Sequence, residues 1–200
     1  MPVQWIPGRG FFGNSYLSGD ILIDAGVLPT AVEPFRNRIG VIVLTHCHFD
    51  HIAHLQEIAH LTGAEVAIHE CDAPGLLSGT DSLALHFGSR PLGIVPDMLL
   101  GEGDRVGNLL VLHTPGHTRG SVCFYHEQER SLISGDTVFS DGGFGRYDFP
   151  GGSRDDLVRS VRRLAGIDVE GLYPGHGDPV LSGGAQHIHA ACEMLVKGYG

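Results

Sequence analysis

Three histidines and one aspartate fall within six residues of this sequence, directly after a short apolar run. The segment reads Thr45-His46-Cys47-His48-Phe49-Asp50-His51 and follows Val41–Leu44. A Val/Ile-rich run of this length is typical of a buried strand. The cluster is therefore predicted to lie where a strand ends and a helix begins, which is a usual place for chemistry in an α/β fold.

The spacing within this cluster indicates which side chains can act together. Side chains alternate along extended backbone, so the rings of His46 and His48 are expected on one face and the Cys47 thiol in the core. Asp50 and His51 would turn in from the helix start, which is an arrangement for two metal ions rather than one. Core histidines are the alternative, but four buried ligand-type side chains would each need a polar partner.

Three further ligand-type side chains each follow a predicted strand. They are His117 after Leu109–Leu112, Asp136 after Leu132–Ile133, and His176 after Gly171–Tyr173. Glycine concentrates in the loops that carry these histidines. The pattern therefore indicates more than one segment that delivers a side chain to a site.

The remaining hydrophobic periodicity predicts strands that alternate with helices. Further strands are expected at Val3–Ile6, Ser15–Leu17, Ile21–Ile23, Val66–Ile68 and Val122–Tyr125. Helices are expected at Pro29–Arg36, at His51–Leu61, after a capping box at Ser153-x-x-Asp156, and at Ala185–Val196. Residues 71–104 are the least regular part, and they predict either a lid or substrate loop or a short helix pair on the sheet.

Composition limits the class of protein. The 200 residues suit one domain spanning 1–200, and 42% apolar with 18% charged residues is ordinary for a globular chain. The formal net charge of −10 argues against a nucleic-acid partner. No membrane-spanning run or secretory signal is visible, so a cytoplasmic location without a membrane partner is expected. The four cysteines lack Cys-x-x-Cys spacing, which indicates neither a zinc ribbon nor a disulfide framework.

Over nearly its whole length the sequence resembles the metallo-β-lactamase superfamily, and most closely the hydroxyacylglutathione hydrolase (glyoxalase II) branch with its small single-domain relatives. The matching motifs are His46-x-His48-x-Asp50-His51, Leu112-His113-Thr114-Pro115-Gly116-His117-Thr118, Gly135-Asp136-Thr137, Gly145-Arg146-x-Asp148-Phe149-Pro150 and Tyr173-Pro174-Gly175-His176-Gly177. The resemblance implies an αββα sandwich with metals at one edge of two sheets.

The same resemblance implies a dinuclear metal centre. In this pattern His46, His48 and His117 would bind the first ion, Asp50, His51 and His176 the second, and Asp136 would bridge them. Imidazole and carboxylate ligands suit zinc, iron or manganese. Two divalent ions are expected, zinc first, with iron or manganese as alternatives.

The function implied by the resemblance is a metal-dependent hydrolase. A metal-bridging hydroxide would cleave a small thioester or related acyl substrate, with Asp50 and Asp136 as the catalytic carboxylates. The alternatives are a mononuclear-iron persulfide dioxygenase and a lactonase or β-lactamase-type hydrolase. The partner would be a small molecule, and the sequence indicates no oligomeric state.

Three departures from the glyoxalase II pattern matter. The helix after the histidine cluster usually opens with glycine in this family, but here it reads Ile52-Ala53-His54, and His54 would either support the site or simply pack. Arg146 would receive a substrate carboxylate or form a salt bridge with Asp148. Little chain follows His176, so the helical C-terminal domain that contacts glutathione is not expected. Other histidines, namely His113, His187 and His189, are expected to have ordinary structural roles.

Overall fold

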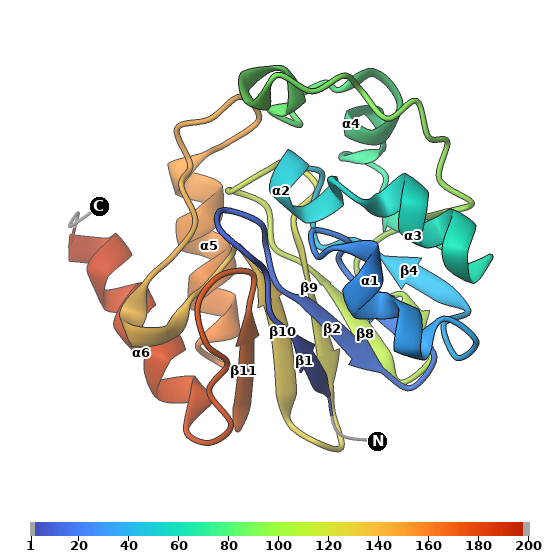
Figure 1. The fold of residues 1–200 in the computed structure, drawn as a ribbon. Coiled ribbons are helices and arrows are strands. Elements are labelled where there is room, and N and C mark those ends of the chain that lie inside the picture. The colour runs from blue at the N-terminus through green and yellow to red at the C-terminus, as the bar shows by residue number, and fades with distance from the viewer. Residues whose placement is uncertain (1–2, 198–200) are drawn as a thin grey trace. The chain divides into compact units, whose positions relative to one another are not determined.

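The computed structural model describes residues 3–197 and contains two mixed β-sheets with helices (Figure 1). The chain divides into two compact units, Met1–Leu100 and Gly101–Gly200, here called the N-terminal unit and the C-terminal unit. Each unit holds one sheet. This organisation confirms the predicted α/β class, and one domain over residues 1–200 stays a prediction.

The sheet of the N-terminal unit has six strands in sequential order. They are β1 (Gln4–Ile6), β2 (Ser15–Ser18), β3 (Ile21–Ile23), β4 (Val41–Val43), β5 (Glu65–His69) and β6 (Met98–Leu100). The first three pair antiparallel, whereas β3 through β6 pair parallel. The β2–β3 turn uses Gly19 at φ 61°, a left-handed conformation that glycine adopts without steric cost.

Helices connect the parallel strands of this unit. They are α1 (Pro29–Val32) and the 3₁₀ helix η1 (Glu33–Phe35) before β4, α2 (Phe49–Ile52) and α3 (Leu55–Thr62) before β5, and α4 (Ala73–Ser78) and the 3₁₀ helix η2 (Ala84–Phe87) before β6. Leu55 and Ile58 of α3 and Leu76 of α4 are fully buried in one core with strand residues such as Ile42 and Ile68. Burial of these apolar faces fixes the helices on the sheet.

Three predictions for this unit need correction. The helix expected at His51–Leu61 is divided into α2 and α3, because the His54 N–H donates to the Ala25 carbonyl (3.0 Å). The helix expected at Pro29–Arg36 changes to 3₁₀ geometry at Glu33, where Pro34 follows and has no N–H to donate.

The third correction concerns residues 71–104. This segment contains the two short helices α4 and η2, as one of the alternatives expected, but it also contains strand β6. Strand β6 has only three residues and depends on pairing with β5, so local periodicity did not indicate it.

The C-terminal unit has a five-stranded sheet in the order β11-β10-β9-β8-β7. The strands are β7 (Arg105–Val106), β8 (Leu109–His113), β9 (Val122–His126), β10 (Ser131–Gly135) and β11 (Gly171–Pro174). Among the described strands of this unit, only β10 and β11 pair parallel, and helix α5 (Arg154–Leu164) connects them. The 3₁₀ helix η3 (Ser140–Gly142) precedes α5, and α6 (Gly184–Lys197) ends the described chain.

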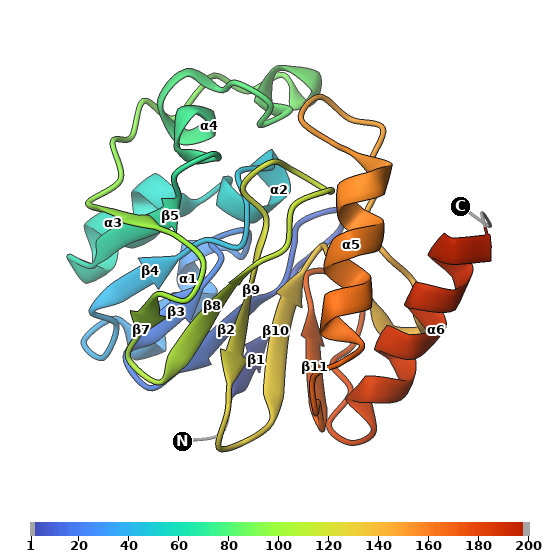
Figure 2. The same ribbon diagram turned by 180° about the vertical axis from the view of Figure 1, so that it is seen from behind.

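The helices of the C-terminal unit bury one apolar face each. Leu157, Val161 and Leu164 of α5 share a core with Ile188 and Leu195 of α6, and Figure 2 shows these two helices beside each other. The Ser153 hydroxyl accepts a hydrogen bond from the Asp156 N–H (3.3 Å), which confirms the predicted N-cap of α5. Of the helices in residues 3–197, none is long and apolar enough to cross a membrane.

Candidate metal centre

The segment from β4 to α2 brings the predicted ligands of the N-terminal unit together. The rings of His46 and His48 lie 4.8 Å apart between centroids, and that of His51 lies 4.2 Å from His46. The ligand atoms of Asp50 and His51 lie within 4.8 Å of each other. His46 and His48 therefore share one face as predicted, and α2 directs Asp50 and His51 from its first turn.

Asp24 supports this cluster from the end of β3. Its carboxylate accepts hydrogen bonds from the Thr45 N–H (2.7 Å) and the Thr45 hydroxyl (2.8 Å). The same carboxylate lies 2.7 Å from Nδ1 of His51. Asp24 is buried and has φ 61°, a left-handed conformation that aspartate tolerates better than most residues. Sequence analysis missed this residue, although a carboxylate directly after a buried strand was the available signal.

These hydrogen bonds decide which nitrogen of each ring carries the proton. A carboxylate only accepts, so Nδ1 of His51 donates to Asp24 and Nε2 carries the lone pair. The Thr45 hydroxyl donates its proton to Asp24. It can therefore only accept a hydrogen bond from Nδ1 of His46, which lies 3.0 Å away. His46 and His51 thus both present Nε2 as a ligand atom. A metal-binding histidine is commonly oriented in this way by a partner on its other nitrogen.

Two close backbone contacts hold α2 in place. The Gly13 N–H donates to the Asp50 carbonyl (3.0 Å), and the Ala25 N–H donates to the His51 carbonyl (2.8 Å). A Cβ atom at Gly13 would lie 2.7–2.9 Å from three atoms of the His51 ring. Glycine at position 13 therefore allows the backbone to pack directly against this imidazole.

Cys47, between the two histidines in sequence, belongs to the core as predicted. Its side chain is buried among apolar residues, and its N–H donates to the Asp72 carboxylate (2.9 Å). Burial, with a smaller contribution from Asp72, raises the pKa of the Cys47 thiol well above its ordinary value. The thiol is therefore neutral near pH 7 and is unsuited to metal binding.

The C-terminal unit brings together the other three predicted ligands. Oδ2 of Asp136 lies 3.5 Å from Nε2 of His117 and 3.5 Å from Nε2 of His176. Nδ1 of His117 lies 2.6 Å from the Arg146 carbonyl, which only accepts, so Nε2 of His117 carries the lone pair. The lone pair of His117 and the carboxylate of Asp136 are therefore close neighbours.

The chain around Asp136 is shaped by glycine. A Cβ atom at Gly145 would lie 2.0 Å from the Asp136 carbonyl oxygen and 2.7 Å from Nδ1 of His117. The Gly175 N–H donates to the Gly135 carbonyl (2.8 Å), which ties the segment of His176 to that of Asp136. Gly145 thus lets the loop pass closely enough for the Arg146 carbonyl to orient His117.

The donor chemistry of both units fits divalent cations. In each unit an imidazole Nε2 that carries a lone pair lies near a carboxylate oxygen, at 3.8 Å for His51 and Asp50 and at 3.5 Å for His117 and Asp136. Two acceptors at such distances repel unless a proton or a cation lies between them. Nitrogen and carboxylate donors of this type bind zinc, iron and manganese. Divided by unit, the seven residues form two partial ligand sets: the N-terminal unit supplies His46, His48, Asp50 and His51, and the C-terminal unit supplies His117, Asp136 and His176.

Two other predicted site residues have mainly structural contacts. The Arg146 guanidinium donates two hydrogen bonds to Asp148 (2.9 and 2.7 Å) and lies 4.2 Å above the Phe149 ring. This contact is the salt bridge expected as the alternative to substrate binding, and it holds the pKa of Asp148 below its ordinary value. Nδ1 of His54 lies 3.3 Å from Glu57, and its ring packs 5.3 Å from Phe12.

The remaining histidines singled out in the sequence have ordinary surroundings. Nε2 of His113 lies 2.9 Å from the Arg119 carbonyl, and Nδ1 of His187 accepts from the Asp141 N–H (2.7 Å). His189 is exposed on α6. None of these three side chains belongs to either partial ligand set within the described residues.

Comparison with known proteins gives the family. The family model of the metallo-β-lactamase superfamily matches residues 8–176. The probable metallo-hydrolase MJ0888 of Methanocaldococcus jannaschii is 35% identical over 86% of this chain and 90% of its own length. The acyl-coenzyme A thioesterase MBLAC2 of Gallus gallus is 31% identical over 78% of this chain and 68% of its own length. The solved structure of TTHA1623 in a di-iron-bound form has a TM-score of 0.79 and 33% identity, covering 88% of this chain and 93% of that one.

The chain therefore belongs to the metallo-β-lactamase superfamily. The predicted α/β metallo-β-lactamase fold is confirmed by the two mixed sheets and by the structural match. The protein is therefore a member of a metallo-hydrolase superfamily, and its clustered histidines and aspartates form a candidate metal site.

Proposed function

We propose that the protein is a metal-dependent hydrolase that cleaves a small thioester. The observation that carries this proposal is the orientation of three histidines by hydrogen-bond partners on Nδ1, which leaves Nε2 as the ligand atom. Asp24, Thr45 and the Arg146 carbonyl supply those partners. Such preparation of ligand atoms supports metal binding over a structural role for the histidines.

The proposed ligand sets follow the family pattern. His46, His48 and His117 would hold one ion, and Asp50, His51 and His176 the other, with Asp136 shared by both. We propose zinc as the metal, with iron as the alternative, because the donor set suits both and a related structure is described as di-iron-bound. When bound, the two cations would activate water and polarise the substrate carbonyl.

The chain's own residues would position the reactants. Asp50 is partly exposed on α2 and can accept a hydrogen bond from the attacking water. This hydrogen bond would orient the lone pair of the water that attacks the substrate. Water adds to the carbonyl carbon, the carbon–sulfur bond breaks, and the sulfur leaves as a thiolate that takes up a proton. The products are a carboxylic acid and a thiol. The thioesterase name of one relative, at 31% identity, supports this choice of bond.

The test is an assay of the purified protein combined with elemental analysis. We expect two divalent ions per chain and cleavage of acyl thioesters without oxygen. A chelator should stop the reaction, and added zinc should restore it. Consumption of oxygen with glutathione persulfide, together with one iron per chain, would instead establish the persulfide dioxygenase.

A further inference from the structure

Four phenylalanine rings of the N-terminal unit form a continuous row. Phe11 and Phe87 stack with their centroids 4.8 Å apart and their planes at 13°. Phe49 continues the stack at 5.5 Å from Phe87, and Phe12 lies 4.3 Å from Phe11 on the other side. We call Phe12, Phe11, Phe87 and Phe49 the aromatic row. None of these side chains has a ligand atom, so metal binding does not explain the row.

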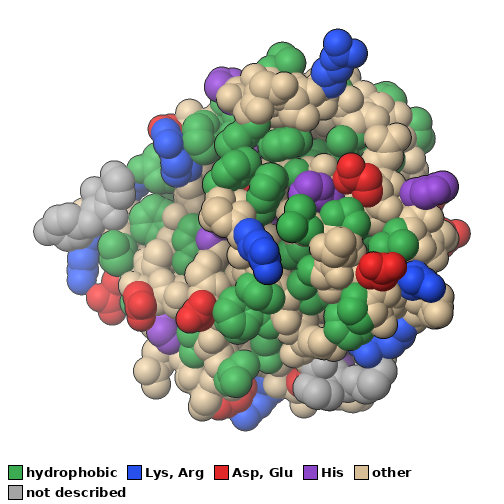
Figure 3. Space-filling view, in the orientation of Figure 1, with side chains coloured by type: hydrophobic (Ala, Val, Ile, Leu, Met, Phe, Trp, Pro, Cys, Tyr) green, Lys and Arg blue, Asp and Glu red, His purple; other side chains and the backbone are tan. Residues whose placement is uncertain are grey.

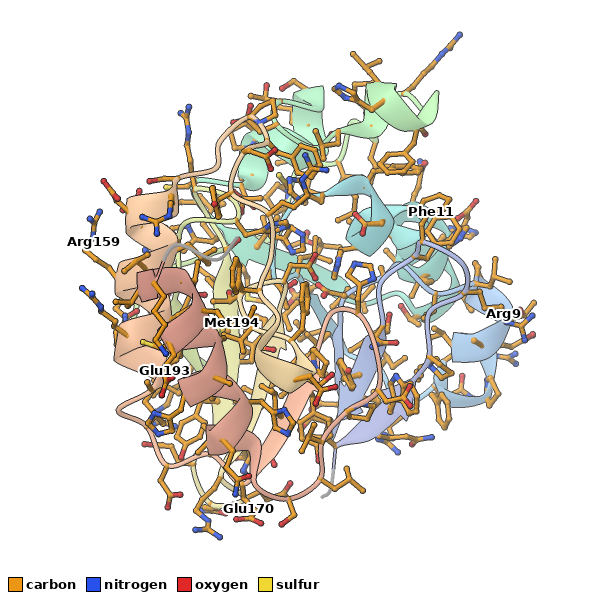
Figure 4. The ribbon with its side chains drawn as sticks, turned by 90° about the vertical axis from the view of Figure 1, so that its left-hand side faces the viewer. Arg9, Phe11, Arg159, Glu170, Glu193 and Met194 are labelled. Atoms are coloured by element: carbon orange, nitrogen blue, oxygen red, sulfur yellow. The ribbon has the colours of Figure 1, made fainter. Side chains whose placement is uncertain are left out.

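The middle of the aromatic row is open to solvent. Phe11 is 50% exposed and Phe87 is 45% exposed. Figure 4 shows Phe11 at the edge of the molecule, and Figure 3 shows hydrophobic side chains exposed among polar ones on the surface. Single exposed apolar residues are common, but stacked and contiguous exposed rings mark a surface that contacts another molecule or group.

The segment that carries Phe87 is fixed by backbone contacts with the rest of the unit. The Phe49 N–H donates to the Ser82 carbonyl (2.8 Å), which ties the approach to η2 directly to the start of α2. Leu83 then takes a left-handed conformation at φ 60°, which is unfavourable for a bulky side chain. Such strain persists only where the surroundings enforce it, and it is often found at binding sites. The position of the Phe87 ring is therefore determined by the fold.

The aromatic row also borders both ends of the ligand-bearing helix α2. Phe49 lies between His48 and Asp50 in the sequence and begins this helix. At the other end, the Phe12 ring lies 5.3 Å from His54, which follows α2. The residue after Phe12 is Gly13, whose backbone packs against the ring of His51. A group bound on the row would therefore be continuous with the candidate metal ligands of this unit.

We propose that the aromatic row binds the apolar acyl chain of the thioester, so that the enzyme prefers medium-chain acyl groups to short ones. This inference rests on the proposed hydrolase function, because it assigns the acyl part of the same substrate. The thioester carbonyl would lie at the metal ligands, and the chain would extend over Phe11 and Phe87. The row contains no cation or hydrogen-bond donor in its side chains, which favours an alkyl chain over a polar acyl group.

The experiment compares kcat/KM for acetyl, butanoyl, hexanoyl and octanoyl thioesters of N-acetylcysteamine. Full burial of one methylene group increases binding affinity up to about fourfold. Partial cover by the rings should therefore raise kcat/KM roughly two- to threefold for each added methylene. Phe87→Ala should lower the ratio of octanoyl to acetyl activity about tenfold, since it removes cover from two or three methylenes. Phe11→Ala should act in the same direction.

Leu85→Ala is the matched control. Leu85 is on the same 3₁₀ helix and is 76% exposed, but it is not a member of the aromatic row. Its removal should leave the chain-length ratio unchanged. Direct binding of the uncleavable thioether S-octyl-N-acetylcysteamine, measured by calorimetry, should weaken in Phe87→Ala and not in Leu85→Ala.

Two results separate this inference from the proposed function. If thioesters are cleaved but kcat/KM does not depend on chain length, or Phe87→Ala does not change that dependence, the acyl assignment is overturned and the hydrolase stands. If no thioester of any length is cleaved, the proposed function itself fails. A dimer that Phe87→Ala converts to a monomer, with the chain-length ratio unchanged, would assign the row to self-association and overturn the acyl proposal.

Discussion

Oδ2 of Asp24 lies 2.7 Å from Nδ1 of His51, although the two residues are 27 positions apart in the sequence. Both side chains are buried, so this charge-assisted contact is shielded from water. The carboxylate also accepts from Thr45, and through that hydroxyl it reaches His46. One buried aspartate therefore orients two of the proposed ligand rings.

We expect Asp24→Asn to weaken metal binding about 10- to 100-fold, as is usual when the partner of a ligand histidine is lost. Asparagine keeps the size of the side chain and tolerates the left-handed backbone at φ 61°. It lacks the charge, and it offers one acceptor oxygen where aspartate offers two. The measurement is a competitive zinc titration against a chelating dye.

Asp20→Asn serves as the control for the Asp24 substitution. Asp20 is exposed in the β2–β3 turn, and its replacement removes the same charge from the same hairpin. Its zinc affinity should match that of the wild type. Equal affinity in Asp24→Asn would show that the contact with His51 is structural only.

Metal removal should destabilise the fold. A ligand present at 100 times its Kd adds about 2.7 kcal/mol to the free energy of unfolding, and about 1 kcal/mol shifts the Tm of a chain this size by roughly 2–4 °C. A chelator should therefore lower Tm by about 5–10 °C, as measured by calorimetry. If elemental analysis shows that metal has been stripped and Tm has not moved, metal binding is not coupled to stability.

Asp136→Ala should lower the metal content below two per chain and abolish activity. Its Oδ2 atom lies at the same distance from Nε2 of His117 and of His176, which suits a shared ligand. Asp178→Ala removes an exposed carboxylate two residues after His176 and is the matched control. Retention of two ions in Asp136→Ala would rule out the bridging role.

Much of this site follows from local sequence, and the reason is physical. His46, His48, Asp50 and His51 follow a buried strand within six residues, so backbone alternation and the helix start already bring them together. The cap at Ser153 is local for the same reason. Features of this kind depend only on residues that are close in the sequence, so they can be predicted from it.

The features that were missed depend on distant contacts. The pairing of Asp24 with His51 requires β3 and β4 to be neighbours in the sheet. The break between α2 and α3 requires the carbonyl of Ala25. The aromatic row joins residues of three separate segments. Local periodicity carries no information on these pairings, because each arises only when the strands have assembled.

The cysteines should differ sharply in reactivity with a thiol reagent at pH 8. Cys71 is exposed, whereas Cys47 and Cys123 are buried. Burial raises the pKa of Cys123 to about 11 and that of Cys47 above its ordinary value. Both buried thiols stay protonated at pH 8, and only the thiolate reacts. We therefore expect a rapid phase from Cys71.

The thiol prediction is checked by following release of the chromophore from Ellman's reagent. Cys71→Ser should remove the rapid phase, and Cys47 and Cys123 should react only after unfolding. Raising the pH from 7 to 8 should accelerate the Cys71 phase, because the thiolate is the reactive form and its fraction grows with pH. Cys192 is only partly buried, so the decisive variant replaces both Cys71 and Cys192 with serine, and a rapid phase that persists in it would contradict the burial of Cys47 and Cys123.

His176→Ala should separate the hydrolase from the persulfide dioxygenase. Nε2 of His176 lies 3.5 Å from Oδ2 of Asp136, and in the proposed hydrolase His176 would complete the ligand set of the second ion. A mononuclear iron oxygenase needs only two histidines and one carboxylate, which His46, His117 and Asp136 could supply. We therefore expect His176→Ala to lower the anaerobic rate of thioester cleavage by on the order of 10²–10³, as when a key electrostatic group is removed. His189→Ala, which removes an exposed histidine of α6, is the control and should keep the wild-type rate. Oxygen consumption with glutathione persulfide that survives in His176→Ala would favour the dioxygenase, because that enzyme does not require the second ion.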